Sequence, residues 1–178
     1  MKKVIAAFGA LAGFVVLLVA LAAVLVFTSP REHTVTGSVL VDAAPADVFA
    51  RATDLDRRED WAPMLVKLRK TDDKHWTEET EWGDKMSFEV VAHDPPKFHK
   101  VRIVNADELG FGGAWSWRVE AHGKKTRVSI TEDGYVDNLL FRVLSKYVFG
   151  HESNIKLTLE AFATHMGEKN PSVTFANP

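Results

Sequence analysis

The stretch GGAWSWRVEAHGKKTRVSITEDG, residues 112–134, alternates apolar and polar side chains on both sides of a short turn. Trp115 and Trp117 fall on alternate positions of its first half, and Val128 and Ile130 on alternate positions of its second half. Because successive side chains of a strand point to opposite faces, each half presents one apolar face. The link His-Gly-Lys between the halves predicts an antiparallel hairpin. The two tryptophans then face either a packed core or a space that another molecule fills.

The hairpin is the last part of a series of strand patterns. Residues 33–43 alternate as a first strand. Pro45 and Asp47 then favour the start of a short helix over 45–53, and a second short helix is expected over 56–61. The short turn-forming links between the later segments predict an antiparallel meander. These strand-like segments are 64–71, 74–82, 85–93, 97–105, 114–122 and 125–136.

A long helix is predicted at the C-terminal end of this series. Apolar residues recur at steps of three and four over 138–166, and Gly150 predicts a bend. The remaining residues, 167–178, contain two prolines and no periodicity, so they are expected to form a loose tail. The order of elements predicts an α+β fold in which one curved antiparallel sheet wraps around the long helix, because the apolar face of each needs the other.

The N-terminal segment differs in kind from the rest. Residues 4–27 contain no charged or strongly polar side chain, and as a helix they span about 36 Å, enough to cross a bilayer. A cleaved signal peptide is the alternative, because Ala20–Ala22 has the small-x-small form, but the apolar run is longer than the about 7–15 residues of such peptides. Lys2 and Lys3 place the N-terminus in the cytoplasm and the domain on the extracytoplasmic side of the membrane. The expected organisation is a transmembrane anchor (1–30), one domain (31–166) and the tail (167–178).

Composition and motifs exclude several classes of function. The net charge is −2, and basic and acidic residues are interspersed, so nucleic-acid binding is not expected. The chain has no cysteine, which excludes disulfides and thiolate sites. His93 and His99 flank a turn, but strand alternation puts them on opposite faces, and neither a metal site nor a cofactor is expected. The glycine cluster at 110–113 is expected to form a flexible loop.

Three stretches together resemble one known superfamily. VDAAPADVFARATDLDRREDWAP (41–63), HDPPKFHKVRI (93–103) and the hairpin at 112–134 are similar, in order and spacing, to the START/Bet v1-like superfamily, also called SRPBCC or polyketide cyclase/dehydrase-like. The resemblance covers about residues 34–166. It implies a helix-grip fold, a sheet of about seven strands curled around the C-terminal helix. It also implies a cavity between sheet and helix, which members use to bind lipids, sterols, quinones or polyketides.

The inward-facing residues are therefore candidates for a ligand cavity, although a filled core is equally compatible with the pattern. The expected function is a membrane-anchored domain that binds or transports a hydrophobic small molecule or lipid. The candidate lining residues are Phe88, Val101, Ile103, Trp115, Trp117, Ile130, Glu132, Leu144, His151 and Ile155.

Two of these residues are polar. Strand periodicity puts Glu132 on the inner face beside Ile130, and His151 falls on the inner stripe of the helix. As acid and base they would suit an enzyme of the cyclase or dehydratase kind, which is the first alternative. A structural salt bridge and a satisfied core histidine are the simpler interpretations. A second alternative is an envelope adaptor with a filled interior that docks a protein partner.

Overall fold

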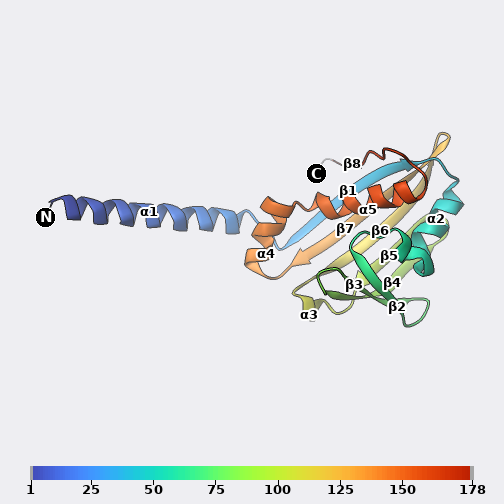
Figure 1. Ribbon diagram of the computed structural model, residues 1–178, viewed down its shortest axis with the longest axis horizontal. Coiled ribbons are helices and arrows are strands. Elements are labelled where there is room, and N and C mark those ends of the chain that lie inside the picture. Colours follow the sequence, from blue (N-terminus) through green and yellow to red (C-terminus); the bar gives the residue numbers. More distant parts are fainter. Residues whose placement is uncertain (1, 177–178) are drawn as a thin grey trace.

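The computed structural model describes residues 2–176, with side chains for residues 13–148 and 150–176. Its domain is built on one antiparallel sheet of eight strands in the order β2-β3-β4-β5-β6-β7-β1-β8 (Figure 1). The strands are β1 (Glu32–Val41), β2 (Leu65–Lys70), β3 (His75–Thr80), β4 (Lys85–Asp94), β5 (Phe98–Ile103), β6 (Phe111–His122), β7 (Lys125–Val136) and β8 (Thr174–Phe175). The α+β fold, with its large antiparallel sheet and packed helices, is confirmed.

The helices occupy the two ends and one face of this sheet. Two short ones follow β1, as predicted from Pro45 onward. The helices are α1 (Lys2–Phe27), α2 (Pro45–Thr53), η1 (Leu55–Asp60), α3 (Ala106–Leu109), α4 (Leu139–Leu144), η2 (Ser145–Phe149) and α5 (Glu152–His165). Helix α5 lies along β1 and β7 and closes the core of the domain (Figure 1).

The predicted long C-terminal helix is divided into three parts. Helix α4 continues into the π-helical turn η2, and Gly150 then takes a positive φ of 74° before α5 begins. A positive φ is strained for residues with a side chain but not for glycine. The bend predicted at Gly150 is therefore a complete break, which lets α5 run along the sheet while α4 turns to its end.

The C-terminal residues are more ordered than the expected loose tail. Thr174 and Phe175 form β8, which pairs with Gly37 and Ser38 of β1 and raises the number of strands from about seven to eight. Phe175 packs against the hydrophobic core. Its ring and Ile155 lie so close to Gly37 that a Cβ there would stand 3.1 Å and 2.7 Å from them. The pairing of β8 with β1 needs a glycine at position 37. A hydropathy pattern does not register this steric requirement, so it did not predict β8.

The glycine cluster at 110–113 is not a flexible loop. Gly110 ends α3 in a left-handed conformation, and β6 begins at Phe111. A Cβ on Gly112 would lie 2.6 Å from that of Ala106 and 2.7 Å from the hydroxyl oxygen of Tyr135. The glycines thus permit a close approach of α3 to the sheet.

The hydrophobic core lies between α2, α5 and the half of the sheet formed by β6, β7 and β1. Three aromatic rings meet at its centre: Phe162 lies edge-on to Trp61 and Trp117, with ring centroids 5.0 Å and 5.5 Å away. The buried core residues are Val39, Val41, Val48, Phe49, Ala52, Trp61, Trp117, Val119, Val128, Ile130, Ile155, Leu159, Phe162 and Ala163.

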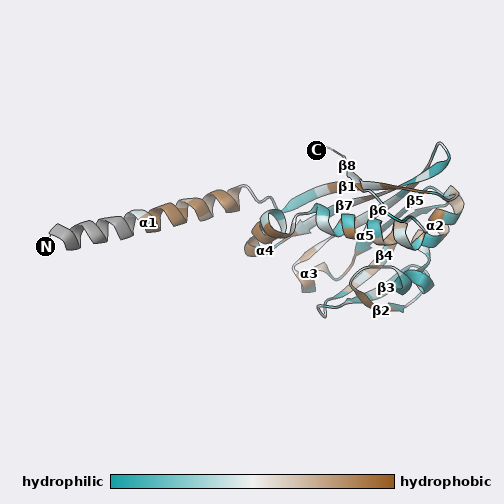
Figure 2. Cartoon of the chain, turned by 45° about the horizontal axis from the view of Figure 1, so that its top comes forward, coloured by the Kyte–Doolittle hydropathy of each residue, from teal (hydrophilic) through white to brown (hydrophobic). Residues whose placement is uncertain are grey.

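Helix α1 extends away from the domain as a single continuous helix (Figure 1). Most of its described side chains are apolar and exposed, in contrast to the mixed surface of the domain (Figure 2). Just after its C-terminal end, the hydroxyl oxygens of Thr28 and Tyr147 lie 2.6 Å apart. Over residues 13–148 and 150–176, no helix combines the length and hydropathy needed to cross a membrane. The predicted apolar span, residues 4–27, lies partly outside these ranges.

Candidate functional site

The domain contains a cavity of about 1220 Å³. Its walls come mainly from the strands β3 to β7, with contributions from β1, α2, η1, α3, α5 and the segment between α4 and α5. A cavity of this size exceeds the roughly 300–1,000 Å³ of ordinary small-molecule pockets. The interior is therefore not filled, which removes the structural premise of the adaptor interpretation.

Seven of the ten candidate lining residues border this cavity. They come from four strands and from the start of α5. They are Phe88, Val101, Ile103, Trp115, Trp117, Glu132 and His151.

The other three candidates, Ile130, Leu144 and Ile155, do not border the cavity. Ile130 and Ile155 have no exposed surface and belong to the packed core where α5 meets the sheet. Leu144 lies at the end of α4, which the break at Gly150 separates from α5. An inward-facing position is thus shared by core and cavity, and strand periodicity does not separate the two.

The strand register explains how the cavity wall is assembled. Trp115 on β6 pairs with Val101 on β5 and with Glu132 on β7, so the three side chains form one row across the inner face. The ring of Phe88 on β4 stacks on that of Trp76 on β3, with centroids 5.4 Å apart. The wall is consequently aromatic over much of its extent, as is usual for sites that bind apolar ligands.

A carboxylate and two imidazoles meet at one part of this wall. Oε1 of Glu132 lies 3.1 Å from Nε2 of His33 on β1, and the ring of His151 stacks on that of His33 with centroids 4.0 Å apart. The second oxygen of Glu132, Oε2, is buried and has no hydrogen-bond partner among the described residues. Sequence reasoning identified Glu132 and His151 but missed His33, because His33 is a neighbour only through the β1–β7 pairing.

The surroundings of His151 favour its neutral form. Burial lowers the pKa of His151, and the neighbouring His33 lowers it further, against the opposing effect of Glu132. A neutral imidazole has one donor and one acceptor nitrogen. This group of residues can accept or hold a proton, which is the minimum that general acid–base chemistry requires.

A second polar cluster lines the cavity and was not predicted. Nε of Arg58 on η1 donates to Oε1 of Glu78 on β3 over 2.6 Å, and Nε1 of Trp76 donates to the same oxygen over 2.9 Å. Glu78 is buried, and its charge is compensated by Arg58. The one available sequence signal was the period-two alternation that places Glu78 on the same face as the buried Trp76.

The expected separation of His93 and His99 is wrong. A register shift between Val90 and Ala92 reverses the alternation of β4, so that His93 comes to face His99. Their Nδ1 atoms lie 3.0 Å apart. His99 is buried and borders the cavity, and burial is the main cause that lowers its pKa to about 4.

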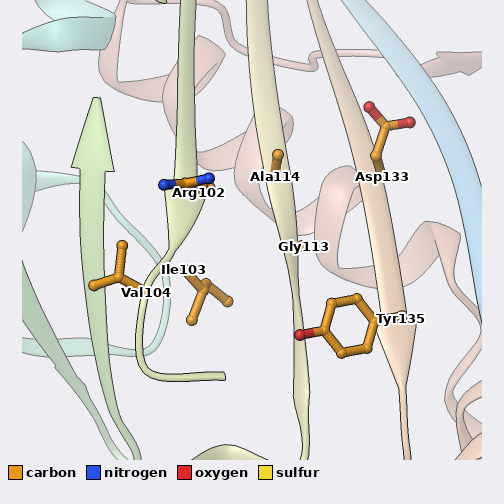
Figure 3. A pocket seen from close by; sticks show the side chains of 7 residues that line it. All are labelled: Arg102, Ile103, Val104, Gly113, Ala114, Asp133 and Tyr135. Carbon is orange, nitrogen blue, oxygen red and sulfur yellow. The ribbon is translucent and has the colours of Figure 1, made fainter. Parts of the chain in front are cut away.

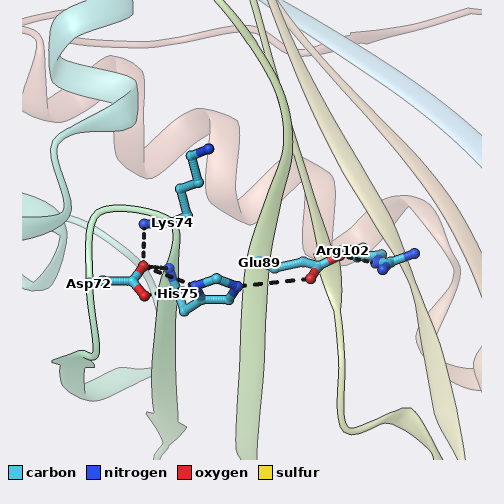
Figure 4. Close-up of polar contacts among 5 residues, drawn as sticks. All are labelled: Asp72, Lys74, His75, Glu89 and Arg102. Atoms are coloured by element: carbon cyan, nitrogen blue, oxygen red, sulfur yellow. Dashed lines mark hydrogen bonds and ion pairs between the residues drawn. The ribbon is translucent and has the colours of Figure 1, made fainter.

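The outer face of the sheet carries the exposed side chains of Arg102 and Arg118. A more open depression of about 450 Å³ lies there, where Arg102, Ala114 and Asp133 form a row across β5, β6 and β7 (Figure 3). Arg102 pairs with Glu89, and His75 links Glu89 to Asp72 (Figure 4). Hydrogen bonds, the strongest from the amide of Lys74, lower the pKa of Asp72. This chain of charges is fully paired and resembles an ordinary solvated surface.

Comparisons with known proteins agree with the geometry. Comparison with curated proteins finds no significant match. Among solved structures, a norcoclaurine synthase point mutant from Thalictrum flavum, in complex with a transition-state analogue, is 12% identical with a TM-score of 0.61, over 76% of this chain and 94% of that one. A conserved protein from Geobacillus kaustophilus is 11% identical with a TM-score of 0.63, over 79% and 99% of the two chains.

A further similar structure contains two domains. It is the di-domain ARO/CYC protein StfQ from the steffimycin biosynthetic pathway, 13% identical with a TM-score of 0.56, and the match covers 76% of this chain and 51% of that one. These likenesses establish the fold. The family described as polyketide cyclase / dehydrase and lipid transport matches residues 32–167, and the chain belongs to this family.

Proposed function

We propose that the domain binds a hydrophobic small molecule or lipid in the cavity between the sheet and the C-terminal helices. The observation that carries the proposal is the cavity itself, about 1220 Å³ of space bordered by Phe88, Trp115 and other apolar side chains. Burial of apolar ligand surface there would contribute about 25 cal/mol per Å². The family's description includes lipid transport, and one protein of similar fold, norcoclaurine synthase from Thalictrum flavum, has been solved in complex with dopamine and hydroxybenzaldehyde, which supports a small organic ligand.

A homologous series of linear alkyl ligands tests this proposal. Each methylene that enters an apolar cavity contributes about 0.8 kcal/mol, which corresponds to about fourfold in affinity. Affinity should rise by this factor with each added carbon and level off when the cavity is full. Tryptophan fluorescence reports the binding, since four of the five tryptophans border the cavity (Trp76, Trp82, Trp115 and Trp117). Absence of binding across the series would contradict the proposal.

An enzyme of the cyclase or dehydratase kind is the second candidate, and the contact between Glu132, His33 and His151 favours it. A cavity-bound substrate would give or take a proton at this cluster. Ligand extracted before and after incubation with the protein should then differ by mass spectrometry. The variants Glu132→Gln and His151→Gln should bind the ligand but leave it unchanged. Conversion that persists in both variants would exclude this candidate.

We also propose that residues 1–30 hold the domain at a membrane, with the N-terminus in the cytoplasm. The uninterrupted helix α1 and its exposed apolar side chains, such as Phe14 and Leu17, support this proposal. The chain lacks cysteine, so single cysteines report topology cleanly. In intact cells a membrane-impermeant maleimide should label Ser172→Cys but not Lys3→Cys. Equal labelling of both, or recovery of the protein without its first residues, would contradict the anchor.

A further inference from the structure

The second polar cluster, formed by Arg58, Glu78 and Trp76, borders the cavity, and His99 borders the same cavity. Arg58 comes from η1, Glu78 from β3 and His99 from β5, and all three border the cavity. Polar groups in a mostly apolar pocket usually fix the orientation of the ligand. The cluster therefore indicates which chemical group of a ligand reaches this part of the wall.

The guanidinium of Arg58 has more N–H donors than the surrounding residues have acceptors for them. Its Nε binds Glu78, and its guanidinium carbon lies 5.4 Å from the ring centroid of Trp61. Within residues 13–148 and 150–176, neither Nη nitrogen has a hydrogen-bond acceptor, although the side chain is only 16% exposed. Guanidinium carries five N–H donors, so four remain for water or a ligand.

His99 contributes an uncharged ring beside this guanidinium. Its Nδ1 contacts Nδ1 of His93, so one of the two nitrogens donates and the other accepts. Burial is the main cause that lowers its pKa to about 4, and the neighbouring His93 and Arg58 act in the same direction. Near neutral pH the ring is neutral, and the Nε2 of this cavity-lining side chain has no hydrogen-bond partner among the described residues.

The charge on Arg58 is already balanced by Glu78. A carboxylate ligand would place a second negative charge next to Glu78, which is buried and fixed by two hydrogen bonds. A neutral oxygen acceptor meets the open N–H donors without this repulsion. We propose that Arg58 and His99 form a polar subsite that receives the carbonyl oxygen of an otherwise apolar, neutral ligand. The inference rests on the proposed ligand-binding function and specifies the ligand for it.

Three probes of matched length test the inference: undecan-2-one, undecane and undecanoate. The full chain, in a fluorinated surfactant that mixes poorly with alkyl chains, would be titrated with each probe by tryptophan fluorescence. The test variant is Arg58→Met combined with Glu78→Gln, because removal of Arg58 alone would leave a buried charge unpaired. Arg57→Met is the matched control, since Arg57 is the adjacent arginine and its ion pair with Asp60 is exposed.

The ketone should lose about tenfold in affinity in the double variant, as expected for a hydrogen bond to a charged donor. The alkane should bind the double variant as it binds the unchanged protein, and Arg57→Met should alter neither. His99→Leu should weaken the ketone alone as an independent check. Equal losses for ketone and alkane, or tighter binding of undecanoate than of the ketone, would overturn the subsite while leaving the binding function intact. Failure of all three probes to bind would overturn both proposals.

Discussion

Oε1 of Glu132 lies 3.1 Å from Nε2 of His33, and this contact joins β7 to β1 at the wall of the cavity. Both side chains are largely buried, with 18% and 12% of their surfaces exposed. Because Oε2 of Glu132 already lacks a partner, His33 is the sole hydrogen-bonding contact of this carboxyl group among the described side chains. The contact therefore supports both the sheet and any proton chemistry in the cavity.

Loss of His33 should leave the buried carboxyl group of Glu132 without a hydrogen bond and so destabilise the fold. His33→Ala leaves Glu132 without a partner, and we expect the free energy of unfolding to fall by about 1–3 kcal/mol. Adding Glu132→Leu removes the unpaired group, so the double variant should be more stable than His33→Ala. Urea denaturation followed by tryptophan fluorescence measures both. Glu32→Gln, at an exposed position on the same strand, is the control. Additive losses in the double variant would show that the two residues are not coupled.

The low pKa of His99 predicts a dependence of stability on pH. The folded pKa of about 4 lies below the ordinary value of 6.5, so between these values the unfolded chain binds a proton that the folded chain does not. Stability should therefore decrease as the pH falls from 6.5 to 4, by at most about 3 kcal/mol from this residue. His99→Gln should flatten this part of the profile, measured as the urea midpoint at successive pH values. Identical profiles for the two proteins would refute the assignment.

The two tryptophans of the hairpin should behave differently on substitution. Trp117 is 2% exposed and contacts Trp61 and Phe162, whereas Trp115 is only partly buried and stands at the edge of the core. Trp117→Ala should cost about 3–5 kcal/mol of stability. Trp115→Ala should cost less and should weaken apolar ligands more. Parallel denaturation and binding measurements decide this, and equal stability losses would contradict the distinction between core and cavity wall.

Gly37 should tolerate no side chain. A Cβ at this position would lie 2.7 Å from Cγ2 of Ile155, which is rigid and fully buried. Gly37→Ala should lower the free energy of unfolding by about 1–3 kcal/mol through overpacking. It should also increase amide hydrogen exchange at Ala176, whose N–H donates to the carbonyl oxygen of Thr36. Unchanged stability would show that α5 and β8 shift without cost.

Local patterns were sufficient for most of the fold. Alternation around Trp115 and Val128, the turn residues and the apolar stripe before Met166 each depend on near neighbours in the chain, so they identified the meander and the C-terminal helix. The break at Gly150 was visible only as a glycine in a helical pattern.

The site was harder to predict because its polar groups meet through pairing and irregularity. His33 reaches Glu132 through the β1–β7 register, and one extra residue in β4 brings His93 to His99. Arg58 reaches Glu78 from a separate helix. None of these contacts produces a periodic pattern in the sequence. The same limit applies to Ile130, because core and cavity wall share one face of the sheet.

Native mass spectrometry of the gently purified full chain, followed by organic extraction, tests the central claim most directly. We predict a reproducible added mass that is lost on denaturation, and an extract that contains an apolar molecule with a neutral carbonyl group. A bare protein mass, unchanged after incubation with a membrane lipid extract, would contradict the account. The cavity between the sheet and the C-terminal helices would then hold only water.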